Sequence, residues 1–358
     1  MSASRWSAPG WAALVAVGGL ALLAPSAADA VRWLPFLLGL VVFSLPHGAV
    51  DHHVPRRLGH GRTREFVAVY ALAVLAGLAL WALAPVATLV AFLVVAGLHW
   101  GAGDAWFART VHGRRPFAGR GDAVLFVAAR GMLPVALPAL AHPGELARGA
   151  DAILGAVGAG AAPVLAGAPR VAGLVTVAVV VAAAAVSALR AGPGGPRGRA
   201  IDAGELLLLA VFFVVTPAVL AVGTYLLVWH APRHVARLIA TDPEQAALPP
   251  ARGLLAWTRE AAPLTLVSLA GLGLLLATAW RGPVAPEAVG GAGLALIAAL
   301  TFPHAAVVAW MDRAQRVYTP LSPGASVTST VPRAARPGAR AARRGGSAPA
   351  PASPARAR

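Results

Sequence analysis

Long apolar stretches recur along most of the chain, and each is bounded by Pro, Gly, Arg or other polar residues. A helix needs about 20 mostly apolar residues to cross the hydrocarbon core of a bilayer, so stretches of this kind predict membrane spans. Ten candidates follow one another: Trp11–Ala24, Val31–Leu45, Phe66–Leu83, Pro85–Trp100, Ala123–Ala141, Val171–Leu189, Glu205–Leu220, Ala221–Ala240, Pro263–Trp280 and Ala288–Met311. We therefore predict an all-α fold, a polytopic transmembrane helical bundle of eight to ten spans.

Some boundaries are weak because several stretches fall short of a full span. The two stretches in 205–240 form one long or broken element, with Pro217 and Gly223 as candidate turn points. Ala27–Ala30 has small residues at a distance typical of signal-peptide cleavage, an alternative to the retained first span that we favour. The Gly/Ala-rich segment Ala150–Pro169 is a candidate partial or re-entrant piece.

The composition excludes two broad classes of protein. Of the 358 residues, 58% are apolar and only 12% are charged, whereas a soluble domain carries about 25% charged residues. This balance rules out a disordered chain and an ordinary soluble enzyme. The chain has no Cys, which excludes disulfides, thiolate metal sites and Cys nucleophiles.

The charge pattern predicts an orientation in the membrane. The formal net charge is +16, and all 30 basic residues are Arg. Such a charge can indicate nucleic-acid binding, but arginines in a membrane protein mark cytoplasmic loops, so we expect no nucleic-acid partner. Most arginines between the predicted spans fall on one side when the N-terminus is cytoplasmic. We therefore expect a multi-pass protein of the cell membrane with both termini in the cytoplasm.

The chain changes character at Thr319, where Pro, Ala, Gly, Ser and Arg become dominant and acidic residues are absent. We predict a transmembrane catalytic domain over 1–318 and a disordered tail over 319–358. Seven arginines lie in this tail. Contact with anionic lipid and an inert, solvated tail are both open as its role.

Four histidine motifs lie in or at the ends of apolar stretches, and ionisable residues at membrane depth are functional hypotheses by default. They are LPHGAVDHH at 45–53, LHWGAGD at 98–104, WHAPRH at 229–234 and FPH at 302–304. The stretches that carry His47, His99 and His230 all run toward the cytoplasmic side in the predicted topology. Their imidazoles are therefore expected at one depth, near the cytoplasmic face.

His230 and His234 are four residues apart, which places them on one face of a helix and within reach of one metal ion. Pro232 between them removes a backbone hydrogen bond and can kink the helix. With His47 and His99 at the same depth, we favour metal binding over ordinary polar contacts between helices. Imidazole ligands without thiolate suit iron, copper, zinc or nickel.

Neighbouring polar residues are candidates for support of this site. Asp51 and Asp104 follow His47 and His99 closely, either as ligands, as acceptors that orient an imidazole ring, or as capping and interface residues. His304 is a candidate for contact with substrate or for support of the site. His52 is a weaker candidate, because it lies among arginines at the expected interface.

Aromatic residues gather at the same motifs, among them Trp100, Trp229 and Phe302. They are either anchors at the membrane interface or the lining of a slot for a flat apolar ligand. The sequence contains no phosphate loop, no Ser-His-Asp signature and no HExxH zinc motif.

The motifs together resemble one known family. PHGAVDH at 46–52, LHWGAGD at 98–104, WHAPRH at 229–234 and PHAAVVAWMD at 303–312 occur in order over roughly 35–315. They are similar to those of the Brp/Blh family of bacterial and archaeal membrane β-carotene 15,15'-dioxygenases. The long Arg-rich tail and the segment near 150–170 depart from the family without touching these motifs.

The resemblance implies a substrate, a reaction and a cofactor. The family cleaves the central double bond of β-carotene with O2 and yields two all-trans retinals, which serve microbial rhodopsins. The family's motif histidines fall on His47, His99, His230 and His234, which implies a four-histidine site for non-haem Fe(II). The bilayer is then the source of the substrate.

Three other functions are alternatives to carotenoid cleavage, and each would require its own sequence features. A membrane desaturase or hydroxylase with a diiron site needs about eight histidines with HxxHH boxes, but His52-His53 is the one doublet here. A transporter or proton channel would be expected to show paired intramembrane carboxylates or inverted repeats. A non-catalytic partner of a rhodopsin would have no need of four converging histidines.

Overall fold

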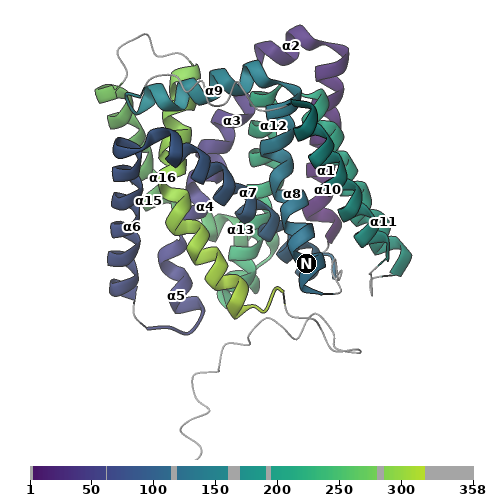
Figure 1. The fold of residues 1–358 in the computed structure, drawn as a ribbon. Coiled ribbons are helices and arrows are strands. Elements are labelled where there is room, and N and C mark those ends of the chain that lie inside the picture. Colours follow the sequence, from purple (N-terminus) through teal and green to yellow (C-terminus); the bar gives the residue numbers. More distant parts are fainter. Residues whose placement is uncertain are drawn as a thin grey trace, which may run out of the picture.

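The computed structural model of the protein describes residues 3–61, 63–113, 119–159, 170–190, 195–279 and 286–318. All regular elements within these ranges are helical, which confirms the all-α prediction (Figure 1). Six apolar segments among them have the length to cross a bilayer: Pro25–Arg57, Thr63–Leu83, Pro85–Thr110, Arg120–Ala141, Pro250–Ala277 and Ala288–Ala314. Two shorter apolar helices, Ser7–Leu23 and Gly173–Val186, lie beside them. The chain is thus a multi-pass helical bundle.

The α-helices follow in chain order as α1 (Ala3–Leu23), α2 (Pro25–Ala30), α3 (Leu34–Gly39), α4 (Leu45–Ala49), α5 (Val54–Arg57), α6 (Thr63–Leu83), α7 (Pro85–Thr110), α8 (Arg120–Ala141), α9 (Pro143–Ala156), α10 (Arg170–Arg190), α11 (Gly195–Val215), α12 (Ala218–Tyr225), α13 (Ala231–Thr241), α14 (Pro243–Ala246), α15 (Pro250–Ala279) and α16 (Pro286–Ala314).

The N-terminus and the C-terminal end of α16 lie in the lower half of Figure 1, and α9 lies across the opposite end of the bundle. Part of the segment expected to be re-entrant, 150–156, belongs to α9, and 160–169 lies outside the described residues. The predicted tail, 319–358, also lies outside them.

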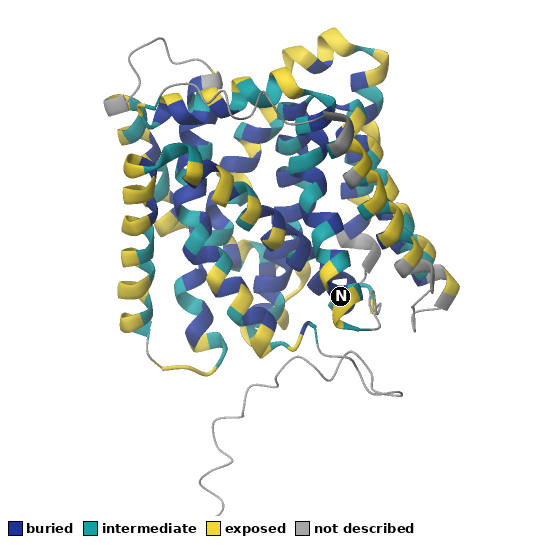
Figure 2. Cartoon of the chain, in the orientation of Figure 1, coloured by how far each residue is buried: buried dark blue, intermediate teal, exposed yellow. Residues whose placement is uncertain are grey.

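The outer surface of the bundle is apolar. Figure 2 shows exposed residues along the outward face of α6 and buried residues in the interior. Among the exposed side chains are Leu72 at 66% and Leu274 at 65% exposure. A soluble protein seldom leaves so much large apolar surface in contact with water, so these faces suit lipid chains.

Glycines bring α7 and α8 into backbone contact. Gly97 and Gly101 are spaced as in a GxxxG motif, which allows close helix packing in membranes. A Cβ on Gly101 would overlap the Val127 carbonyl oxygen, and a Cβ on Gly131 would overlap that of Gly97. This packing holds the part of α7 that carries His99.

Two π-helical turns, Leu40–Ser44 and Leu226–His230, interrupt the α-helical ladder next to the histidine motifs. Pro46 and Pro232 follow them closely. A proline has no N–H to donate, and its ring clashes with the carbonyl group four residues earlier, which explains why the α-helical ladder is not kept. The two turns pack against each other, and His47 follows the first by three residues while His230 ends the second.

The break predicted within 205–240 is present at one of its two candidate positions. Helix α11 ends at Val215 and α12 begins at Ala218, so the turn at Pro217 is confirmed. The alternative turn at Gly223 is wrong. Gly223 lies inside α12, where a Cβ would come within 2.6 Å of the backbone nitrogen of Phe36, and its small size therefore serves helix packing.

Candidate metal centre and substrate cavity

Five imidazoles from four segments of the bundle meet in its interior. His99 lies on α7, His304 on α16, and His47 on α4. His230 ends the second π turn, and His234 follows on α13. Ring centroids are 4.8 Å apart for His99 and His230, 4.8 Å for His47 and His304, and 5.1 Å for His234 and His304. All are buried except His47, which is half-buried.

The ring nitrogens are spaced as ligands of one ion would be. The Nε2 atoms of His99 and His230 are 3.1 Å apart, and one nitrogen from each of His47, His99 and His230 lies within 4.8 Å of the others. Two nitrogens bound at about 2.1 Å to one metal ion lie about 3.0–3.4 Å apart at square to tetrahedral angles. The spacing of the first pair falls in this range.

Hydrogen bonds leave lone pairs available in the cluster. The Nδ1 of His47 donates to the Phe43 carbonyl oxygen at 2.9 Å, so Nε2 of the neutral ring keeps its lone pair. Neither ring nitrogen of His234 has a hydrogen-bond partner among the described residues, although His234 is only 2% exposed. An unpaired buried polar group costs about 1–3 kcal/mol, which a metal–nitrogen bond would offset. The donor set therefore fits a metal such as iron.

His304 joins the cluster through a chain of hydrogen bonds. Its Nδ1 donates to Asp51 Oδ2 at 2.8 Å, and the Tyr70 hydroxyl donates to the same oxygen at 3.1 Å. The other ring nitrogen, Nε2, is buried without a hydrogen-bond partner. A carboxylate that orients a histidine in this way is typical of metal sites. Asp51 follows His47 in sequence, but it orients His304 in space.

Asp104 belongs to a separate network of buried charges. It accepts from Arg233 Nη1 at 2.8 Å, from Arg130 Nη1 at 3.1 Å and from Trp229 Nε1 at 3.1 Å. Glu205 accepts from both guanidinium groups, at 3.0 and 2.9 Å. Its partners in this network are guanidinium and indole groups and no imidazole, so a role as a ligand or as an acceptor that orients an imidazole stays a prediction.

The network adjoins the histidine cluster because Arg233 lies in sequence between His230 and His234. Its guanidinium group lies 3.6 Å from the centroid of the Trp229 ring, a cation–π contact. Arg130 and Glu205 lie outside the histidine motifs, although each is a charged residue within or at the edge of an apolar stretch and could have been selected on that ground.

Of the remaining candidate residues, Trp100 contacts the histidine cluster, whereas no described contact of His52 or Phe302 is with it. Trp100 contacts the His230 ring, with 6.0 Å between centroids, and lines a cavity. His52 donates to the Ala49 carbonyl oxygen and packs on His53, and none of its described contacts is with the cluster. Phe302 lies near Gly77 on α6.

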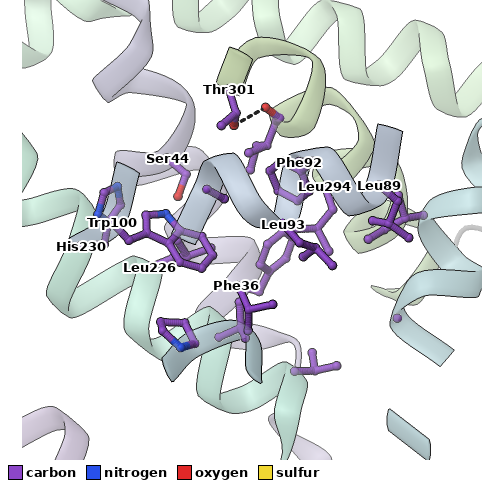
Figure 3. Close-up of a pocket in the computed structure, with 18 of the residues that line it drawn as sticks. Phe36, Ser44, Leu89, Phe92, Leu93, Trp100, Leu226, His230, Leu294 and Thr301 are labelled. Carbon is purple, nitrogen blue, oxygen red and sulfur yellow. Dashed lines mark hydrogen bonds between the residues drawn. The ribbon is translucent and has the colours of Figure 1, made fainter. Parts of the chain in front are cut away.

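A large apolar cavity leads to the imidazoles. It encloses about 1190 Å³ of space, part of it open to the surroundings. His47, His99, His230 and His304 form one part of its wall. Figure 3 shows His230 and Trp100 close together, with Phe92, Leu93 and Leu89 following along α7. The lining is almost entirely aliphatic and aromatic, which suits a hydrocarbon ligand.

Residues 38–312, which include all five histidines of the cluster, match the family described as β-carotene 15,15'-dioxygenase. The chain belongs to the β-carotene 15,15'-dioxygenase family. It is 38% identical to the probable β-carotene 15,15'-dioxygenase Blh of Halobacterium salinarum, in an alignment covering 87% of this chain and 92% of the relative. It is 28% identical to the probable β-carotene 15,15'-dioxygenase Brp of the same species, over 79% and 84% of the two chains. No solved structure matches the chain at a significant level.

Proposed function

We propose that this chain cleaves the central 15,15' double bond of β-carotene with O2 to give two all-trans retinals. We further propose that His47, His99, His230 and His234 hold a non-haem Fe(II). The observation that carries the proposal is the convergence of buried imidazoles on the wall of a large apolar cavity. Membership of the dioxygenase family and the name of the Blh relative support the same substrate.

The reaction balances without a further oxidant. The central carbon–carbon double bond breaks, and each of its two carbons receives one oxygen atom from a single O2. The chemistry that ferrous iron supplies when bound is the activation of O2 toward the alkene.

The protein positions both reactants. The apolar walls hold the polyene against the imidazoles, and fixing its geometry lowers the barrier through proximity. The phenyl ring of Phe92 and the indole of Trp100 line the cavity, where they exclude water from the reacting carbons. Asp51 fixes the ring orientation of His304 beside the ligands.

The surroundings of the cavity agree with a lipid-soluble substrate. β-Carotene dissolves in the bilayer, so a site inside a membrane bundle avoids its transfer to water. We place the protein in the cell membrane with both termini in the cytoplasm, on the basis of its apolar helices and the side on which its arginines fall. Delivery of retinal to a microbial rhodopsin through the same bilayer completes the proposal.

The test is expression in cells that accumulate β-carotene, followed by pigment extraction and iron analysis of the purified protein. We expect loss of β-carotene, formation of retinal and about one iron per chain. Alanine at each proposed ligand should abolish turnover and lower the iron content: His47, His99, His230 and His234. His60→Ala is the control, because His60 is exposed. Unchanged β-carotene with folded, iron-loaded protein would refute the function, and full activity of one alanine variant would remove that residue from the ligand set.

A further inference from the structure

A second cavity reaches two of the five imidazoles, His47 and His304. It encloses about 720 Å³ of space, part of it open to the surroundings, between α4, α6, α15 and α16. The two cavities share His47 and His304, together with Ser44, Ile297 and Thr301. His99 and His230 line the first cavity only. The pair His47 and His304 therefore stands at a junction between two apolar spaces.

The second cavity lies at the lipid-facing side of the bundle. Its lining includes Leu264 and Val267 of α15, which are 43% and 65% exposed. Ser268 on the same helix is half-buried, and its hydroxyl donates to the Leu264 carbonyl oxygen, so it leaves no unpaired donor in the cavity. Tyr70 of α6 also lines this cavity, and its hydroxyl donates to Asp51, the partner of His304.

The symmetry of the substrate explains why two spaces are needed. β-Carotene has equal halves on either side of the bond that is cut, and each half is a long, rigid hydrocarbon. When the central bond lies beside the metal ligands, the halves extend in two directions. A single cavity that ended at the imidazoles would hold one half and leave no room for the other.

We propose that the second cavity holds the second half of the carotenoid, so that the central bond lies at the junction of the two cavities. This inference rests on the proposed function. The first cavity takes one half of the polyene up to the junction at His47 and His304. The other half extends past the junction into the second cavity, along Leu264 and Val267 at its lipid-facing side.

The test uses two substrates, β-carotene and β-apo-8'-carotenal, in which one of the two halves is truncated. Ser268→Trp fills the second cavity, and Ala270→Trp is the matched control, because Ala270 is exposed on α15 and does not line this cavity. Gly149→Trp fills the first cavity at α9, where a Cβ on Gly149 meets no atom within 4 Å. Each variant is scored for retinal formation, iron content and β-carotene that co-purifies under anaerobic conditions.

Ser268→Trp should lower β-carotene cleavage and co-purification at least about tenfold, since apolar pockets discriminate by roughly 10–200-fold for small changes in fit. Cleavage of the truncated substrate should fall much less. Its short half fits the narrowed second cavity while its long half lies in the first cavity. Gly149→Trp should behave in the same way. The double variant should cleave neither substrate, because neither cavity can then hold a full half of the carotenoid.

Two results would overturn the inference. One is that Ser268→Trp cleaves both substrates as the wild type does. The other is an equal loss of both substrates at unchanged iron content. Failure of the proposed function is distinct, because the wild-type protein and Ala270→Trp would then also fail to form retinal.

Discussion

Replacement of Asp104 by Leu tests whether the buried charge network stabilises the proposed metal centre. Asp104 is only 3% exposed and accepts from two guanidinium groups and one indole N–H. Arg130 Nη1 keeps a second acceptor in Glu205. The substitution therefore removes the acceptor chiefly from Arg233 Nη1 and from the indole N–H of Trp229.

The cost follows from these two donors. Breaking one side of a buried ion pair costs about 3–5 kcal/mol, well above the 0.5–1.5 kcal/mol of an ordinary hydrogen bond. We expect Asp104→Leu to lower the thermal unfolding midpoint in detergent by roughly 10 °C. Because Arg233 lies between His230 and His234, the variant should also retain less iron.

A double-mutant cycle makes the reasoning refutable. Asp104→Leu combined with Arg233→Met removes both sides of the 2.8 Å pair, so the combined loss should be smaller than the sum of the single losses by about 1–3 kcal/mol. Asp151→Leu makes the same chemical change at an exposed position of α9 and should leave stability and iron content unchanged. Strictly additive losses, or a stable Asp104→Leu variant with full iron content, would show that the network does not support the site.

Gly131→Val should force α7 and α8 apart and abolish monodisperse protein in size-exclusion chromatography, whereas Gly121→Val, at a position with open space, should not. His304→Ala should reduce turnover less than loss of any proposed ligand, with part of the iron retained by mass spectrometry, and complete loss of iron would instead make it a ligand. Burial alone raises the pKa of Asp242, but backbone hydrogen bonds at the start of α14 and the Arg57 guanidinium bring this pKa below its ordinary value. The ionised carboxylate therefore stabilises the fold above about pH 3.9, and this contribution is lost as the pH falls through the lower folded-state pKa. Asp242→Asn should flatten that acid-side loss in pH-dependent unfolding, and an unchanged profile would contradict the assignment.

The local pattern of apolar and polar residues was sufficient to predict the helical elements. Hydropathy is a sum over neighbouring residues, so apolar stretches such as 85–100 could be assigned to a helix without knowledge of their partners. Pro217 marked a real break because a proline acts on its own backbone. Gly223 was misread, because a glycine that ends a helix and a glycine that allows close packing look alike in sequence.

The histidine motifs could be selected from the sequence by type and by place, since an imidazole at membrane depth is costly without a function. Which side chains contact one another could not be predicted from the sequence. Arg233 and Asp104 are 129 positions apart, and His304 and Asp51 are 253 apart. Whether such residues meet depends on the rotation of each helix about its axis and on how closely the glycines of α7 and α8 let the backbones approach. The same packing leaves the two cavities that join at His47 and His304, because empty space inside a bundle is a property of several helices together and of no single segment.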